Sequence, residues 1–270
     1  RVFSSYGYNI ELLETTGHRI IETGLKYVHN DTCYPAILVI GQFIDALKSG
    51  KYDVHKTALI YFQTGGGCRA SNYIFLLRKA LEKAGYGFVP VISINLAGLE
   101  KHSGFKLTVP LLHRLFYAII YGDVLMNITN QCRPYELNKG ETERLADKFT
   151  LELANKMLTE GVSFKKVKAN SKKMLDAFAK IPRSDETKVK VGVVGEIYVK
   201  YSPLGNNNLE QFLLDEGAEV VVPGLLDFFM YCIVSNITDV PLYELHKMRK
   251  PILNFVFNYL VKQQKEIIAL

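Results

Sequence analysis

Cysteine is scarce in this sequence, and its spacing excludes several familiar sites. The chain of 270 residues has four cysteines, and no two of them form a C-x-x-C pair. A zinc ribbon or a thioredoxin-type site is therefore not expected. Four scattered cysteines in a chain of this length are typical of a reducing compartment rather than of a disulfide framework. The four positions are Cys33, Cys68, Cys132 and Cys232.

The usual phosphate-binding motifs are also missing. A glycine run at residues 65–67 precedes a helical pattern, but no Gly-Lys-Ser/Thr follows it, which excludes a P-loop. The G-x-G-x-x-G spacing of dinucleotide-binding folds is absent as well. A phosphatase-type loop would have an arginine six residues after Cys68, where this chain has Ile74. The glycine run therefore belongs to none of these standard motifs.

The sequence has no signal peptide and no long apolar run. Its most apolar stretches, residues 115–122 and 228–234, are far shorter than the roughly 20 residues of a membrane-spanning helix. The net charge is +6, but the densest lysine cluster, at residues 165–173, indicates a solvated helix face rather than a nucleic-acid patch. We therefore expect a cytoplasmic protein that binds neither membrane nor nucleic acid.

The rest of the chain is organised around residues 58–84. Residues 58–62 form an apolar run of the length of a buried strand, and residues 71–84 carry apolar residues at helical spacing. The glycines between them permit positive φ and leave room for a ligand, to which the helix N-terminus points its free N–H groups. Cys68 at this turn could act as a thiolate nucleophile or metal ligand. A tight turn with an incidental buried cysteine is the alternative interpretation.

Strand and helix patterns alternate along much of the chain. The expected strands are residues 8–13, 58–62, 89–94, 189–194 and 219–222. The expected helices include residues 16–28, 35–48, 141–159 and 164–179. Because the crossovers are long enough for parallel pairing, this order predicts an α/β fold with doubly wound parallel sheets, in two α/β units with additional helices. The polar segment 181–188 is the expected boundary between a first unit, residues 1–182, and a second, residues 183–270.

Five segments, in order along almost the whole chain, resemble one known family. They are G-L-K-Y-V-H-N-D-T-C-Y-P-A at residues 24–36, F-Q-T-G-G-G-C-R-A-S-N-Y at 62–73, G-F-K-L-T-V-P-L-L at 104–112, R-P-Y-E at 133–136 and V-G-V-V-G-E-I-Y-V-K at 191–200. They resemble the 2-hydroxyacyl-CoA dehydratase-like region of large proteins called acyl-CoA dehydratase activase-related. The resemblance implies a Rossmann-like fold in both units, with the cysteine loops in the first.

The resemblance also implies a cofactor and residue roles. Its relatives hold an oxygen-sensitive [4Fe–4S] cluster on cysteine thiolates and take part in ATP-driven electron transfer to a dehydratase. There the electron enables the removal of water from a 2-hydroxyacyl-CoA. Cys33 and Cys68 stand in the family's motifs and are the implied metal ligands, whereas Cys132 and Cys232 do not carry over. The implied cofactor-binding residues are Gly65, Gly66, Gly67, Arg69 and Glu196.

The implied partners lie outside this sequence. A further cysteine motif of the family, P-F-G-C-L, is missing, so we expect the rest of a longer chain, with an ATPase activase region, and a dehydratase as partners. Whether the chain is a dehydratase-like lyase or part of the activase stays open, as does the acyl-CoA substrate. We expect Cys33 and Cys68 to meet near residues 65–67 and 195–208. On this chain alone no cluster is expected, because two thiolates are too few.

Two other functions are compatible with the residues. One is a metal-free Rossmann-like module that binds a CoA ester or a nucleotide at the strand ends. The other is nucleophilic catalysis by Cys68 without a metal, although no histidine lies near it in sequence to act as a base. The placement of both motif cysteines near helix N-termini favours the iron–sulfur hypothesis, because such sites suit the net negative charge of a cluster.

Overall fold

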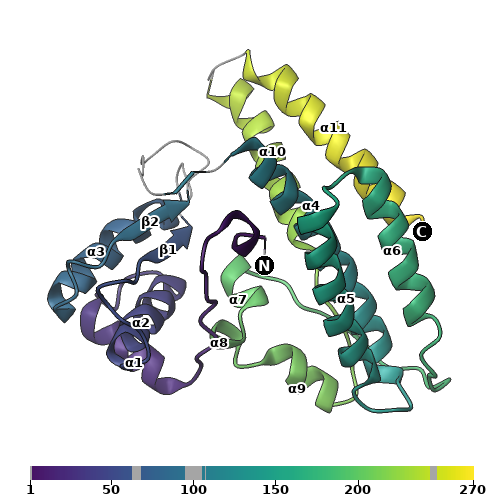
Figure 1. Ribbon diagram of the computed structural model, residues 1–270, viewed down its shortest axis with the longest axis horizontal. Coiled ribbons are helices and arrows are strands. Elements are labelled where there is room, and N and C mark those ends of the chain that lie inside the picture. The colour runs from purple at the N-terminus through teal and green to yellow at the C-terminus, as the bar shows by residue number, and fades with distance from the viewer. Residues whose placement is uncertain (1, 63–67, 95–104, 107, 244–247) are drawn as a thin grey trace. The chain divides into compact units, whose positions relative to one another are not determined.

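A computed structural model describes residues 2–62, 68–94, 105–106, 108–243 and 248–270, and helices dominate it (Figure 1). The α-helices are α1 (His18–Tyr27), α2 (Tyr34–Lys48), α3 (Tyr73–Ala84), α4 (Val109–Cys132), α5 (Glu141–Thr159), α6 (Phe164–Phe178), α7 (Ile197–Tyr201), α8 (Pro203–Asn206), α9 (Leu209–Asp215), α10 (Leu225–Leu242) and α11 (Arg249–Ile268). The strands are β1 (Leu59–Phe62), β2 (Val91–Ile94), β3 (Lys190–Gly192) and β4 (Glu219–Val221). Short 3-10 helices are η1 (Ser4–Tyr6), η2 (Arg69–Asn72) and η3 (Arg133–Tyr135).

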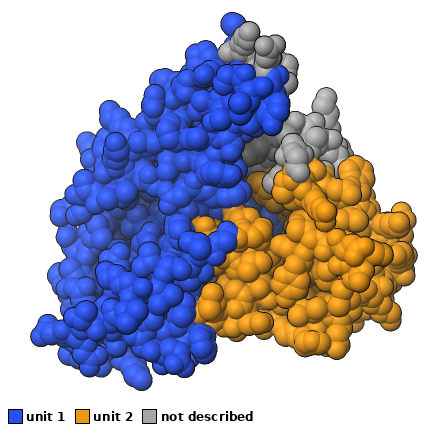
Figure 2. Space-filling model, turned by 180° about the vertical axis from the view of Figure 1, so that it is seen from behind, with its two compact units in different colours: residues 1–10, 108–195, 210–270 blue, residues 11–107, 196–209 orange. Residues whose placement is uncertain are grey.

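The chain divides into two compact units, which Figure 2 shows in different colours. The first consists of Arg1–Ile10, Thr108–Gly195 and Glu210–Leu270, and the second of Glu11–Leu107 and Glu196–Leu209. The second unit is therefore built from two separate stretches of sequence. The expected boundary at residues 181–188 lies inside the first unit. Whether residues 1–182 and 183–270 form separate domains stays a prediction.

Helices bury one another in the first unit. Its core combines apolar side chains of α4, α5, α6, α10 and α11, and α4 packs against α5, α6 and α10 (Figure 1). On α5 the buried residues Phe149, Leu153 and Met157 recur every four positions, which is the spacing of one helix face. The strands β3 and β4 form a parallel pair in which Lys190 lies opposite Glu219.

The second unit packs α2 and α3 onto a single parallel pair of strands. Leu59 of β1 lies opposite Val91 of β2, and both side chains are buried with the apolar faces of the two helices. Helix α1 packs closely on α2. The second stretch of this unit adds α7 and α8, and Leu204 of α8 is buried against Ile20 and Leu38.

The prediction of doubly wound, Rossmann-like sheets is wrong. Among the described residues each unit holds only one parallel pair of strands, four residues long in the second unit and three in the first. Residues 8–13, expected to be a strand, have none of its hydrogen bonding, and Leu12 is 78% exposed. A doubly wound fold needs a wide parallel sheet covered by helices on both faces. Here most apolar helix faces pack on other helices, so the protein is mostly helical.

Several predictions for single elements are confirmed. The expected helix at residues 141–159 is α5, and the expected helix at 164–179 is α6 with one residue fewer. Four of the five expected strands occur, and they pair in parallel. The local patterns were therefore correct where the sheet architecture was not.

Two helices are long and apolar enough to cross a membrane by length and composition alone, Val109–Tyr135 and Leu225–Leu242. Both extend well beyond the short apolar stretches considered in the sequence. Of their most apolar windows, 28% and 17% of the residues are buried. Because core helices of soluble proteins pass the same test, this finding does not locate the protein, and the cytoplasm stays a prediction.

Candidate thiolate site

Cys33 lies at the start of α2, as its N-cap residue. Its carbonyl oxygen accepts hydrogen bonds from the backbone N–H groups of Ala36 and Ile37, at 2.9 and 3.3 Å. Pro35 follows in the first turn, where a missing N–H group leaves no helical hydrogen bond unmade. The Cys33 side chain is half-buried and packs against the core of the second unit. The sequence thus fixes this thiol at the N-terminus of a largely buried helix.

Cys68 occupies a similar position before η2 and α3. Its Sγ accepts a hydrogen bond from the backbone N–H of Ala70 at 3.5 Å, and its carbonyl oxygen accepts one from the Ser71 hydroxyl at 2.7 Å. The sulfur therefore caps a helical start, as a serine or aspartate oxygen commonly does. Unlike Cys33, the Cys68 residue is exposed. The glycine run of Gly65, Gly66 and Gly67 lies outside the described residues.

Arg69 links the two loops that carry the cysteines. Its Nη1 donates a hydrogen bond to the carbonyl oxygen of Asp31 at 3.4 Å. Asp31 lies two residues before Cys33, and Arg69 directly follows Cys68. A guanidinium has five N–H donors, so this bond leaves donors for other acceptors. The sequence-predicted cofactor residue Arg69 is thus part of the same group of loops as both cysteines.

Two stacked tyrosines lie beside these cysteines. The rings of Tyr61 and Tyr73 stack with centroids 5.7 Å apart and planes 11° from parallel. Burial raises the pKa of Tyr73, and so do a hydrogen bond with Cys33 and the negative charges of Cys33, Cys68 and Glu196. The pKa of Tyr61 is raised mainly by burial, and further by the charges of neighbours that include Cys33 and Glu196. Both sulfurs are therefore within electrostatic reach of one phenolic hydroxyl.

Glu196 reaches this group from the second stretch of the unit. It is the N-cap residue of α7, and its Oε2 accepts a hydrogen bond from the backbone N–H of Val199 at 3.0 Å. The neighbouring Tyr198 packs on the cluster of Ile20, Leu38 and Leu204, and burial raises its pKa. Packing of α7 and α8 thereby places the Glu196 carboxylate near the two tyrosines, although its binding role stays a prediction.

The described residues supply only part of an iron–sulfur site. A [4Fe–4S] cluster is normally held by four cysteine thiolates, and Cys33 and Cys68 are the only two cysteines of this unit. Within the described ranges no three or more His, Cys, Asp or Glu side chains are grouped so that they could hold a metal ion. These residues alone therefore do not fit a complete cluster, and we derive no reaction step through one.

The other two cysteines have a different environment. Cys132 is 4% exposed in α4, where Arg183 Nη1 lies 3.7 Å from its Sγ. Burial raises the pKa of Cys132 despite this arginine, and burial also raises the pKa of Cys232 in α10. Both belong to the first unit. A buried neutral thiol is a poor metal ligand, so their surroundings favour a packing role.

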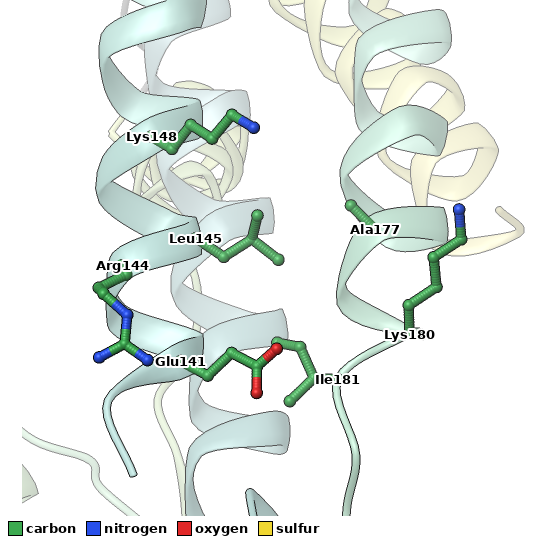
Figure 3. Close-up of a pocket in the computed structure, with 7 residues that line it drawn as sticks. All are labelled: Glu141, Arg144, Leu145, Lys148, Ala177, Lys180 and Ile181. Atoms are coloured by element: carbon green, nitrogen blue, oxygen red, sulfur yellow. The ribbon is translucent and has the colours of Figure 1, made fainter. Parts of the chain in front are cut away.

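The pockets of the protein do not coincide with the cysteines. One, of about 330 Å³, lies between α5 and α6 in the first unit, where Leu145, Ala177 and Ile181 are apolar and Lys148 and Lys180 lie at its sides (Figure 3). Another, of about 340 Å³, lies near the end of α3 and the start of β2. Neither is lined by any residue that the sequence singled out, so the candidate site rests on the convergence of side chains.

The sequence analysis missed the tyrosines. Tyr73 is the first residue of α3 and is only 7% exposed, and Tyr61 lies in β1. In a pattern of apolar spacing both count simply as core residues. One signal was present: Tyr73 closes the quoted segment of residues 62–73, five positions after Cys68. No family model, no curated protein and no solved structure matches this chain.

Proposed function

We propose that this chain contributes Cys33 and Cys68 as two thiolate ligands of a [4Fe–4S] cluster, in an electron-transfer module related to 2-hydroxyacyl-CoA dehydratases and their ATP-dependent activators. One observation carries the proposal. The two cysteines are 35 positions apart in sequence, yet both act on the Tyr73 hydroxyl. These are the two cysteines that stand in the motifs of the resembled family.

The position of the two sulfurs supports this proposal. Cys33 begins the 15-residue helix α2, and Cys68 caps η2, which leads directly into α3. The partial positive charge of helix N-termini stabilises negative charge, and a cluster with its thiolates is negatively charged. Arg69, whose guanidinium bonds to the loop before Cys33, adds a positive charge to the same region.

The missing ligands define what else the proposal requires. When bound, a cluster of this type supplies one-electron transfer. Two protein thiolates leave further iron corners to be held by groups outside the described residues, such as a partner polypeptide. In this chain Cys33 and Cys68 would bind the metal, while Tyr61 and Tyr73 would exclude water from one side of it.

Reconstitution with an added thiol tests the proposal on this chain. The protein is purified without oxygen and incubated with ferrous iron, sulfide and 2-mercaptoethanol, which can occupy the remaining iron corners. We expect iron and acid-labile sulfide to stay with the protein through gel filtration. Cys33→Ser and Cys68→Ser should each lose most of this iron, whereas Cys132→Ser and Cys232→Ser should retain it.

Two results would overturn the proposal. One is a wild-type protein that retains no iron or sulfide under these conditions. The other is equal iron content in all four serine variants, which would indicate that the metal binds without Cys33 and Cys68. Far-UV circular dichroism of each variant shows whether it is folded before the iron content is compared.

A further inference from the structure

Tyr73 lies where both cysteines can be influenced by a single side chain. It is the first residue of α3, is 7% exposed, and stacks on Tyr61. Its hydroxyl hydrogen-bonds with Cys33, and it is close enough to Cys68 to experience that charge as well. Tyr61 is itself fixed by an edge-on contact with Phe43, at 6.0 Å between ring centroids.

We propose that Tyr73 is a positioning residue, whose hydroxyl donates a hydrogen bond to Sγ of Cys33 and holds this sulfur toward Cys68. The role as a support for metal ligands rests on the proposed function. The hydrogen bond itself does not, because it is a property of the metal-free chain.

The chemistry of the pair explains this assignment. A phenol has one O–H donor, and a thiolate sulfur accepts hydrogen bonds. Groups that hydrogen-bond to metal ligands orient them and tune the metal, and their loss typically weakens metal affinity 10-fold to 100-fold. Tyr73 is held by burial and ring stacking, so its hydroxyl keeps a defined direction. A long flexible donor such as lysine would lose more side-chain entropy on being fixed there.

Tyr61 provides the matched control. It lies in the same stack, it is likewise affected by the charges of Cys33 and Glu196, and its pKa is also raised by burial. In contrast to Tyr73, no hydrogen bond to a cysteine contributes to its environment. Tyr61→Phe and Tyr73→Phe each remove one oxygen from a stacked ring, and they differ in whether that oxygen contacts Cys33.

Cobalt(II) alone serves as the first probe, because thiolate-to-cobalt absorption reports thiolate ligation directly. We expect Tyr73→Phe to raise the dissociation constant about tenfold, by the magnitude typical of such supporting groups, and Tyr61→Phe to leave it near the wild-type value. Cys33→Ser and Cys33→Ser/Tyr73→Phe should bind cobalt equally weakly, since Tyr73 acts through Cys33. Equal affinity in wild type and Tyr73→Phe would overturn the inference, as would effects of Tyr73 and Cys33 that simply add.

Alkylation of the metal-free protein is the second readout and needs no metal affinity. The rates at Cys33 and Cys68 are measured in the same molecules by mass spectrometry with iodoacetamide at pH 7. Because the hydrogen bond favours the reactive ionised sulfur, Tyr73→Phe should lower the Cys33-to-Cys68 rate ratio several-fold, and Tyr61→Phe should not. An unchanged ratio in Tyr73→Phe would overturn the inference.

The inference and the proposed function fail in different ways. If wild-type protein takes up no iron but both readouts depend on Tyr73, the positioning role stands and the cluster proposal does not. If iron loading requires both cysteines while Tyr73→Phe changes neither readout, the cluster proposal stands and the positioning role is overturned. In iron-loaded protein the loss of this hydrogen bond should shift the reduction potential to a more negative value, because hydrogen bonds to the sulfurs favour the reduced cluster.

Discussion

The close crossing of α1 and α2 is sensitive to a single methyl group. A Cβ atom on Gly24 would lie 2.1 Å from the carbonyl oxygen of Ile37 and 2.8 Å from its Cγ2. One on Gly41 would lie 2.2 Å from the carbonyl oxygen of Ile20 and 2.8 Å from the backbone nitrogen of Gly24. These neighbours are mainly backbone atoms, which cannot move aside by changing rotamer. Either alanine must therefore separate the two helices.

The expected loss of stability follows from two opposing terms. Replacing glycine by alanine inside a helix stabilises it by about 1 kcal/mol through helix propensity. Forcing an extra carbon into a packed interface costs about 1–3 kcal/mol, and more where the backbone has to move. Because both contacts are far shorter than van der Waals distance, we expect Gly24→Ala and Gly41→Ala to lower the free energy of unfolding by about 2 kcal/mol.

Gly122 offers a control within another helix. It is exposed in α4, and a Cβ atom there would meet nothing within 4 Å. Gly122→Ala should therefore raise stability by up to about 1 kcal/mol. Urea unfolding can be followed by tyrosine fluorescence, since the chain has 16 tyrosines and no tryptophan. Hydrogen exchange in α1 and α2 then shows whether the change is local to that crossing.

The refuting result is simple to recognise. If Gly24→Ala and Gly41→Ala raise the urea midpoint as Gly122→Ala does, then the two helices are not in backbone contact. The result also bears on the candidate site, because Cys33 is the N-cap residue of α2. A shift of α2 would move its sulfur relative to Tyr73, so both alanine variants should alter the alkylation rate of Cys33.

Three further expectations follow from other contacts. Hydrogen bonds from Lys156 and a second lysine lower the pKa of Glu152 to about 2, so its stabilisation is present above the normal glutamate range and is lost as the pH falls toward 2. Because the lysines are partly exposed, Glu152→Gln should cost only about 1 kcal/mol or less at pH 6 and nothing near pH 2, and an equal loss at both pH values in urea unfolding would contradict this. Asp123 accepts hydrogen bonds from the first two backbone N–H groups of α10, both at 2.8 Å, so Asp123→Ala should lower the urea midpoint by about 1–2 kcal/mol, and no change would show that the cap is dispensable. Native-state alkylation should be much faster at Cys68 than at the buried Cys132, while similar rates without urea would show that α4 opens readily.

The sequence was most informative about structure that depends on neighbouring residues. Apolar spacing located α5 to the residue, and short β-rich runs located four strands. The width of a sheet is different, because it depends on which strands pair across long stretches of chain. Residues 8–13 have a strand-like composition but lie unpaired and largely exposed. A strand pattern without a neighbouring edge to join therefore led to the wrong architecture.

The candidate site was predictable in part for the same reason. The positions of Cys33 and Cys68 before helices follow from local signals such as Pro35 and the glycine run. The stacked tyrosines could not be found this way, because Tyr61 and Tyr73 come from a strand and a helix that meet only in the folded unit. Their aromatic rings resemble ordinary core residues until the cysteines beside them are known.

The two-part construction of the second unit explains why its site depends on the whole chain. Cys33 and Cys68 come from one stretch of sequence, whereas Glu196 enters with residues 196–209 after the chain has formed α4, α5 and α6. Leu204 docks this later stretch on a patch of α1 and α2. That patch lies on the helix pair whose crossing is fixed by two glycines. Correct packing of α1 on α2 is therefore a condition for bringing the carboxylate of Glu196 to the tyrosines and cysteines.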